Sequence, residues 1–307
     1  MQNGRSEGRV YLDAAEIKRC NAKTAELISL YLNLTPDAIT PDMVTEMAEA
    51  CGFDFSRAYA EILAVMCGLD TVGRDRALFR NYFIPMTKEL SPESFESDPY
   101  YKNISFKHRK IGRWELKTMK LKPCEAFIRD DFTVTNEREL IPMLGFFMRE
   151  FEYPAILEDG REWMTLLPNE TVTTLPAVRK AHGKVLTYGV GLGYFAYMCQ
   201  RKPEVESVTI VELSADAAEI FKTEILPQFE HPEKINLIVG DAVEFAEKKA
   251  PMGKYDFIFA DIWHDVGDGR ELYLKLKSFE KLYPESTEFE YWLEASILCY
   301  LDESLWR

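Results

Sequence analysis

The chain has 307 residues, of which 47% are hydrophobic and 13% aromatic, and it carries a formal net charge of −14. This length and apolar content suit a substantial core and two domains. The negative charge argues against a nucleic-acid partner, because binding phosphates needs clustered Lys and Arg. It is compatible with a cationic or neutral small-molecule substrate. No apolar run reaches the ~18 residues of a membrane span, so we expect no membrane partner and a cytoplasmic location.

The cysteines and histidines carry no metal-site pattern. Six cysteines are scattered along the chain without any C-x-x-C pair, so neither a disulfide framework nor a zinc site is expected. His108, His182 and His231 are isolated, so we predict no metal site.

The first hundred residues favour helices. Thr35-Pro36, Thr40-Pro41 and Ser91-Pro92 are typical of a helix N-cap followed by proline at the first helical position. Residues 1–100 are therefore predicted to form a helical N-terminal domain, and residues 91–103 a polar connector at its boundary. Apolar residues recur at helical spacing in 10–34, 41–51, 54–68 and 74–83.

The next region, residues 101–167, favours strands. Segments 114–122 and 125–134 are rich in strand-forming residues, and 152–167 forms a third such segment. Within the last, Asp159-Gly160 predicts the turn of a β-hairpin. We expect a β-rich segment that connects the helical domain to the rest of the chain.

Residues 168–307 favour an α/β domain with a parallel sheet. Valine, isoleucine and phenylalanine dominate short runs at 184–193, 208–213, 235–242 and 255–261, and helix-compatible segments separate them. Buried parallel strands of βαβ units have this appearance. The pattern predicts a Rossmann-like open sheet with its ligand at the carboxyl ends of the strands.

A glycine-rich turn directly follows the first of these strands. Gly189, Gly191 and Gly193 allow a tight turn and let a ligand approach backbone N–H groups. A dinucleotide-binding turn has its third glycine one residue later, where this chain has Tyr194, which weakens the NAD interpretation. Tyr194 lies inside the turn and is a candidate for stacking on a ligand.

Two acidic residues follow the next two strands. Glu212 lies at the end of the second strand, where a carboxylate can accept hydrogen bonds from both hydroxyls of a ribose. Asp241 follows the third strand and is suitably placed for an adenine amino group. Their neighbours Leu213 and Ala242 belong to the same predicted cofactor site.

From Lys184 to about Lys275 the chain resembles the class I S-adenosylmethionine-dependent methyltransferases, and within them the spermidine-synthase-like branch. Most class I methyltransferases carry an acidic residue two positions before the first glycine of the turn. This chain has Thr187 there, and the spermidine-synthase-like branch also lacks the acidic residue. The third strand matches the I-V-G-D-A pattern at residues 238–242. The fourth strand ends in Asp261, followed by D-V-G at 265–267.

The resemblance implies a cofactor and a role for each site residue. The cofactor would be S-adenosylmethionine or its decarboxylated form, with Glu212 on the ribose and Asp241 on the adenine. The glycines would hold the amino-acid or aminopropyl end. Asp261 would face the reacting centre as a proton acceptor or amine anchor.

One residue of the loop after the fourth strand departs from the family pattern. Where polyamine synthases carry a second aspartate, this chain has His264. His264 and Asp265, beside Trp263, suggest a proton relay and are further catalytic candidates.

The C-terminal residues predict an incomplete sheet. Segment 271–307 favours helix, with leucines and aromatic residues at steps of three and four. No β-branched run remains for a fifth strand. The sheet is expected to be short, to be extended or covered by strands from 114–167, or to be completed by a partner chain, as in a homodimer.

The residues together support a methyltransferase that acts on a small molecule. An aminopropyltransferase of the polyamine-synthase type is the alternative enzyme. A non-catalytic module that binds the nucleoside or a protein partner is a third hypothesis, which an incomplete sheet would favour.

Overall fold

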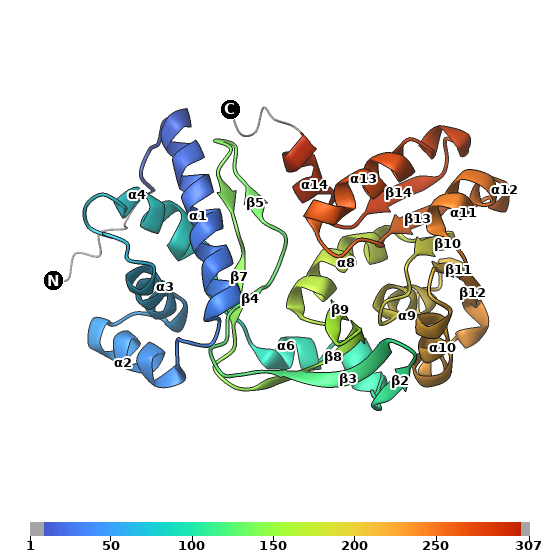
Figure 1. The fold of residues 1–307 in the computed structure, drawn as a ribbon, viewed down its shortest axis with the longest axis horizontal. Helices are drawn as coiled ribbons and strands as arrows, with labels where there is room; N and C mark the ends of the chain where they lie inside the picture. Colours follow the sequence, from blue (N-terminus) through green and yellow to red (C-terminus); the bar gives the residue numbers. More distant parts are fainter. Residues whose placement is uncertain (1–8, 302–307) are drawn as a thin grey trace. The chain divides into compact units, whose positions relative to one another are not determined.

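A computed structural model describes residues 9–301, which divide into two compact units (Figure 1). The first unit contains residues 9–94 and 120–151, and the second contains 95–119 and 152–301. The chain therefore alternates between the units, whereas the sequence predicted three consecutive segments, 1–100, 101–167 and 168–307.

Helices dominate the first unit, as the sequence predicted. Thr40 caps α2 with its side chain and is followed by proline, as expected. The prediction that Thr35-Pro36 begins a helix is wrong, because the Thr35 N–H donates to the Tyr31 carbonyl and closes the last turn of α1. The helical elements are α1 (Ala14–Leu34), α2 (Pro41–Cys51), α3 (Phe55–Met66), α4 (Arg76–Leu78), a π-helical turn (Phe79–Phe83), α5 (Ile84–Met86) and α6 (Pro92–Glu96).

Short strands complete this unit and pack on its helices. Tyr59, Tyr82 and Phe146 are among its fully buried side chains. The Tyr31 and Tyr59 hydroxyls are 2.7 Å apart inside this core, so these two buried hydroxyls are partnered. One sheet has the order β1-β7-β4, with β1 (Thr87–Glu89), β7 (Leu144–Phe146) and β4 (Phe127–Ile128), and a second pairs β5 (Thr133–Val134) with β6 (Leu140–Ile141).

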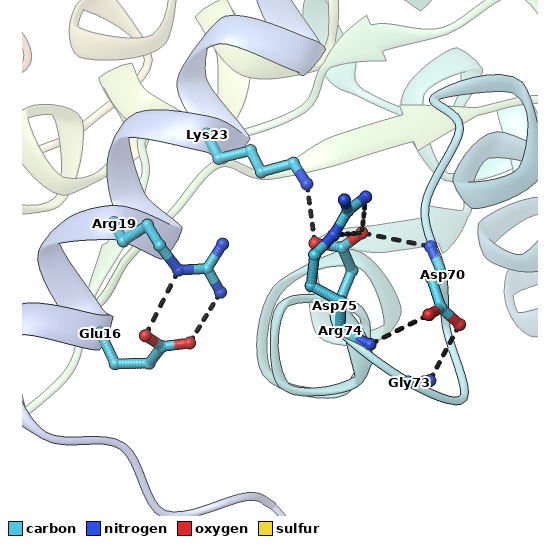
Figure 2. A network of polar contacts seen from close by, with 7 residues as sticks. All are labelled: Glu16, Arg19, Lys23, Asp70, Gly73, Arg74 and Asp75. Carbon is cyan, nitrogen blue, oxygen red and sulfur yellow. Dashed lines mark hydrogen bonds and ion pairs between the residues drawn. The ribbon is translucent and has the colours of Figure 1, made fainter.

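A buried carboxylate ties the loop after α3 to α1. Asp75 is fully buried and accepts hydrogen bonds from Lys23 Nζ at 2.7 Å and from Arg74 Nη2 at 3.1 Å (Figure 2). The backbone N–H of Asp70 donates to the same carboxylate at 3.2 Å, and the Asp70 side chain caps Gly73 and Arg74 in turn. Burial alone would raise the pKa of Asp75, but these hydrogen bonds together hold it well below its usual range.

A five-stranded parallel sheet forms the centre of the second unit. Its order is β12-β11-β10-β13-β14, which is an open α/β arrangement and confirms the predicted fold class. Each of the runs at 184–193, 208–213, 235–242 and 255–261 supplies one strand. The strands are β10 (Gly183–Tyr188), β11 (Val205–Glu212), β12 (Ile235–Val239), β13 (Phe257–Ala260) and β14 (Glu288–Tyr291).

The fifth strand corrects the prediction for the C-terminal residues. Segment 288–291 was expected to be helical, but β14 pairs in parallel with β13 from Phe257 opposite Glu288 to Ala260 opposite Tyr291. Pairing with a buried neighbour decides the conformation of this short segment, which has no β-branched run of its own. The chain supplies this strand itself, so a partner is not needed for it, and the homodimer stays a prediction.

A separate antiparallel sheet has the order β2-β3-β8-β9. Its β8–β9 hairpin turns at Asp159 and Gly160, whose φ angles are 50° and 78°, as the sequence predicted. These strands were predicted to extend or to cover the parallel sheet, and they do not extend it. Trp114 and Leu116 instead pack into the core around it, so the sheet covers it. The strands are β2 (Arg109–Ile111), β3 (Trp114–Leu121), β8 (Phe151–Glu158) and β9 (Arg161–Thr165).

Helices alternate with the parallel strands and bury their faces. Within residues 9–301, no helix is long and apolar enough to span a bilayer. The α-helices of this unit are α7 (Pro99–Asn103), α8 (Pro168–Lys180), α9 (Tyr194–Gln200), α10 (Ala215–Ile220), α11 (Ala242–Lys248), α12 (Ala250–Gly253), α13 (Val266–Lys277) and α14 (Glu294–Leu301). A π-helical turn (Phe221–Ile225) and 3₁₀ turns (Leu226–Gln228, Pro232–Lys234, Glu280–Leu282) join them.

Replacement of the buried carboxylate at Asp75 should destabilise the first unit. Asp75→Asn removes charged hydrogen bonds to Lys23 and Arg74, and we expect a loss of about 1–3 kcal/mol in the free energy of unfolding at pH 7. The lowered pKa of Asp75 means that its contribution is present above about pH 4 and is lost as the pH falls below that value. Urea denaturation at pH 7 and pH 3 measures both effects.

Glu16→Gln is the matched control. It removes an exposed ion pair to Arg19 on the same face of α1 (Figure 2), which contributes about 0.5 kcal/mol or less. Equal losses for Asp75→Asn and Glu16→Gln would contradict the role given to the buried carboxylate.

Candidate active site

A cavity of about 220 Å³ lies at the carboxyl ends of the parallel strands. The glycine turn after β10 lines one part of it, and residues that follow β11, β12 and β13 line the others. Side chains from β9 and α8 complete the wall. The residues that line the cavity include Trp163, Met164, Glu170, Gly189, Val190, Gly191, Tyr194, Glu212, Leu213, Asp241, Ala242, Asp261, Trp263, His264 and Trp292.

The glycine turn requires glycine because of its backbone angles and its close contacts. Gly189, Gly191 and Gly193 have φ angles of 90°, 45° and 76°, which side chains rarely allow. A Cβ on Gly189 would lie 2.3 Å from the backbone oxygen of Asp261. Gly189 and Gly191 line the cavity, whereas Gly193 packs against the ring of Phe221 outside the lining.

Protein acceptors engage most backbone N–H groups of this turn. The Gly189 N–H donates to the Val211 carbonyl at 2.9 Å, and the Gly193 N–H to the Val190 carbonyl at 2.7 Å. The Leu192 N–H donates to the sulfur of Met164 at 3.3 Å. The turn therefore has little capacity left for binding an anion.

Met164 lies directly over the turn. A Cβ on Gly191 would come within 2.0 Å of its sulfur, so the methionine occupies the space that the glycine leaves. Met164 belongs to β9, so its contact with Gly191 places the β8–β9 hairpin over this part of the cavity.

Glu212 is held in a fixed orientation at the end of β11. One carboxylate oxygen accepts from the Val190 N–H at 3.1 Å, and the other from the Ser214 N–H at 2.8 Å. Burial raises the pKa of Glu212 above its usual value, although these backbone hydrogen bonds act in the opposite direction. Each oxygen keeps a further lone pair for a ligand hydroxyl.

Asp241 combines a structural contact with its place in the cavity wall. Its side chain caps α11 by accepting from the Glu244 N–H at 2.7 Å. Ala242 follows it in the lining and is buried, while Leu213 is largely exposed. The structure thus brings Asp241, Ala242 and Leu213 to the same cavity as Glu212.

Asp261 and Glu170 add two further carboxyls to the cavity wall. Neither carboxyl accepts a hydrogen bond from another described residue. Burial raises the pKa of Asp261 from its ordinary value to about 7. Burial, followed by repulsion from Asp261, raises the pKa of Glu170 well above its usual range. Within the described part of the chain, no Lys or Arg lines the cavity.

Sequence reasoning missed Glu170. It occupies the first turn of α8, where an acidic residue is common on any helix. No local pattern distinguishes it, because only the tertiary fold brings α8 beside the end of β13.

The loop after β13 separates the two other catalytic candidates. His264 lines the cavity, and its Nε2 atom is 3.1 Å from the Glu162 carbonyl oxygen, which links the loop to β9. Asp265 instead caps α13 by accepting from the Gly267 and Asp268 N–H groups, and it is absent from the described lining residues. A relay between His264 and Asp265 therefore gains no geometric support.

A tyrosine cluster supports the glycine turn from behind. Tyr100 is fully buried, and its hydroxyl donates to the Leu192 carbonyl inside the turn. The Tyr194 hydroxyl donates to Asp98 at 3.0 Å. Residues 91–103 were predicted as a polar connector, but α7 within them packs into the core through Tyr100.

Part of the chain is similar in sequence to a putrescine N-methyltransferase and to a polyamine aminopropyltransferase. Putrescine N-methyltransferase 1 from Nicotiana tabacum is 29% identical over 126 residues, which cover 40% of this chain and 31% of that protein. The polyamine aminopropyltransferase of Sodalis glossinidius is 31% identical over 113 residues, which cover 34% and 37% of the two chains. The chain thus spans about a third of the length of these curated relatives. No family model matches the chain.

Solved structures that match part of the chain include spermidine synthase from Thermotoga maritima, with a TM-score of 0.32 at 15% identity over 48% of this chain and 58% of that one. Another is titled PigF with SAH, with a TM-score of 0.30 at 23% identity over 37% and 34% of the two chains. The sequence relatives confirm the resemblance to the spermidine-synthase-like branch of the class I methyltransferases.

The raised pKa of the partly buried Asp261 carboxyl should make stability depend on pH. The folded state binds this proton more tightly than the unfolded chain does, so wild-type stability should fall as the pH rises from about 4 to about 7. Asp261→Asn removes this cost, and we expect it to stabilise the chain by about 1–3 kcal/mol at pH 8 and by much less at pH 4. Chemical denaturation at the two pH values measures the difference. The exposed Glu247→Gln serves as control, and a gain that is equal at both pH values would contradict the account.

Proposed function

We propose that the protein is an S-adenosylmethionine-dependent transferase that alkylates a small amine. The observation that carries the proposal is the cavity itself, in which the glycine turn, Glu212, Asp241 and Asp261 meet at the carboxyl ends of parallel strands. The names of the relatives, a putrescine N-methyltransferase and a polyamine aminopropyltransferase, support an amine acceptor.

The residues of the cavity fit the cofactor. Glu212, oriented by two backbone N–H groups, would bind the ribose hydroxyls. Asp241 would accept from the adenine amino group, with Leu213, Ala242 and Tyr194 beside it. The glycine turn would hold the amino-acid or aminopropyl end. When bound, the cofactor supplies an electrophilic carbon next to a cationic sulfur, and a wall with carboxyls and without Lys or Arg among its described residues suits that charge.

Asp261 would take the proton that the reacting amine loses. A general base works best when its pKa lies near the working pH, and burial places the pKa of Asp261 at about 7. His264, bonded to the Glu162 carbonyl, would hold the hairpin over the site. The hairpin would then exclude water from the reaction.

Two observations favour aminopropyl transfer as the second candidate. S-adenosylmethionine carries a carboxylate that its decarboxylated form lacks. The described lining offers no Lys or Arg for that carboxylate, and acceptors within the protein already engage the N–H groups of Gly189, Leu192 and Gly193. The hypothesis of a non-catalytic module rested on the expected absence of a fifth strand. Because β14 supplies that strand, the hypothesis loses this support.

Truncation of Glu212 should weaken cofactor binding. Glu212→Ala removes the charged acceptor of hydrogen bonds from the ribose hydroxyls, so we expect a loss of about 1–3 kcal/mol in the binding free energy of S-adenosylhomocysteine. Isothermal titration calorimetry measures the dissociation constant. Glu206→Gln, an exposed position on the same strand, is the control. Wild-type affinity in Glu212→Ala, or no binding by the wild type of either S-adenosylhomocysteine or its decarboxylated form at millimolar concentration, would exclude this ribose site.

Replacement of Asp261 should affect turnover more than affinity. Asp261→Asn keeps the shape but loses the base, so we expect the rate of transfer to fall by about 10²–10⁴-fold with cofactor affinity nearly unchanged. The assay follows label from methyl-labelled S-adenosylmethionine, or aminopropyl-labelled decarboxylated cofactor, to putrescine and other amines. The label that is transferred identifies the reaction. An undiminished rate in Asp261→Asn would show that positioning alone carries the transfer.

A further inference from the structure

The short helix α7, behind the cavity wall, holds two parts of that wall at once. It carries two tyrosines in succession, and each hydroxyl donates to a backbone carbonyl. The Tyr100 hydroxyl bonds to Leu192 in the glycine turn, and the Tyr101 hydroxyl bonds to Leu166, which directly follows β9. The two tyrosines therefore link the turn to the end of the β8–β9 hairpin.

Both hydrogen bonds are shielded from water. Tyr100, Leu166 and Leu192 are fully buried, and Tyr101 is partly buried. Burial raises the pKa of both tyrosines well above the ordinary value, so both hydroxyls stay protonated and act as donors around neutral pH. Loss of either hydroxyl would leave a buried carbonyl without this donor, which costs more than the loss of an exposed hydrogen bond.

The helix α7 has a fixed place relative to the turn. Asp98 at its start accepts from the Tyr100 N–H at 2.7 Å and from the Tyr194 hydroxyl at 3.0 Å. At its end, the Asn103 side-chain amide donates to the Tyr197 hydroxyl at 2.8 Å. Both ends of α7 are thus tied to α9, the helix into which the glycine turn leads.

The hairpin extends this anchor into the cavity. Its strands β8 and β9 pair with each other, and the Leu166 N–H donates to the Pro154 carbonyl at 2.9 Å, so the base of the hairpin is a hydrogen-bonded unit. Met164 and Trp163, which precede Leu166 on the same strand, line the cavity, and Met164 lies against Gly191 of the turn. A shift at Leu166 would therefore move the side chains that cover the turn.

The contact at the start of β9 is a weaker anchor. There the Nε2 atom of His264 is 3.1 Å from the Glu162 carbonyl oxygen, and the His264 side chain is exposed. Water competes for an exposed hydrogen bond of this kind. The enclosed contact of Tyr101 is thus the better candidate for holding the hairpin in place.

We propose that Tyr101 is a positioning residue for the tail of the cofactor, the part beyond the adenosine. Through the Leu166 carbonyl it fixes β9, and with it Met164 over the turn, where the proposed function places the amino-acid or aminopropyl end. The adenosine end has its own support, because backbone N–H groups orient Glu212. The inference rests on the proposed function and assigns a role to a residue outside the described cavity lining.

The test compares two ligands that share the adenosine and differ in the tail. Titration calorimetry measures adenosine and S-adenosylhomocysteine, or the decarboxylated form of the latter if only that form binds. We expect Tyr101→Phe to weaken the tailed ligand about 5- to 20-fold, the range of a lost buried hydrogen bond, and adenosine by less than about twofold. The ratio separates positioning from a general loss of stability, because both ligands need the same fold. Tyr11→Phe, at an exposed tyrosine, is the control and should change neither affinity.

Hydrogen–deuterium exchange locates the effect. Without ligand, peptides that cover 152–167 should exchange faster in Tyr101→Phe than in the wild type, and peptides that cover 205–212 should be unchanged. A second measurement uses only the wild type and so remains decisive if Tyr101→Phe does not fold. In the wild type, the tailed ligand should slow exchange in residues 162–167, and adenosine should not.

Several results would overturn the inference. They are an equal loss of affinity for both ligands in Tyr101→Phe, no loss for either, unchanged exchange of the hairpin in this variant, or protection of residues 162–167 by adenosine. Failure of the wild type to bind any of these ligands would contradict the proposed function instead. The exchange of ligand-free Tyr101→Phe would then still decide whether this hydroxyl holds the hairpin.

Discussion

The close approach of Gly189 to Asp261 is the contact on which the site depends. At 2.3 Å from the Asp261 backbone oxygen, a Cβ at Gly189 has no space, so only glycine allows the ends of β10 and β13 to meet in this way. The Asp261 N–H also donates to the Tyr188 carbonyl at 3.2 Å, which fixes the aspartate beside the turn. The same turn orients Glu212 through the Val190 N–H and is supported from behind by Tyr100. Backbone geometry therefore sets the distance between the predicted cofactor site and the predicted base.

Local sequence patterns predicted the four strands β10 to β13 and the glycine turn, and they missed β14, Glu170 and Tyr100. The strands β10 to β13 and the glycine turn carry their own signals, namely apolar runs and three glycines at alternate positions directly after the first run. Glu212 and Asp241 follow strands directly, so their place at one edge of the sheet follows from the fold class. In contrast, β14 becomes a strand through pairing with β13. Glu170 and Tyr100 reach the site from helices that precede the sheet in the chain, and no local pattern shows such tertiary contacts.

Charge gives the cavity its chemical character. Its described wall carries the carboxyls of Glu170, Glu212, Asp241 and Asp261 but no Lys or Arg, and the glycine turn uses its own N–H groups to bind protein acceptors. Such a site favours cations and offers little to a carboxylate or phosphate. This preference is consistent with a sulfonium cofactor and an amine acceptor, and it separates the cavity from the dinucleotide sites of other Rossmann-like sheets, where the turn binds a pyrophosphate. The net charge of −14 pointed in the same direction, but only the structure shows where the charge is concentrated.

The central claim is that an S-adenosyl nucleoside binds at the carboxyl ends of β10 to β13, and hydrogen–deuterium exchange with mass spectrometry tests it most directly. Exchange is measured with and without saturating S-adenosylhomocysteine. The account predicts slower exchange in peptides that cover 189–193, 212–214 and 241–242, together with the hairpin residues 162–165 that lie over the turn. Unchanged exchange in these peptides, or protection confined to the helical unit of residues 9–94, would contradict it.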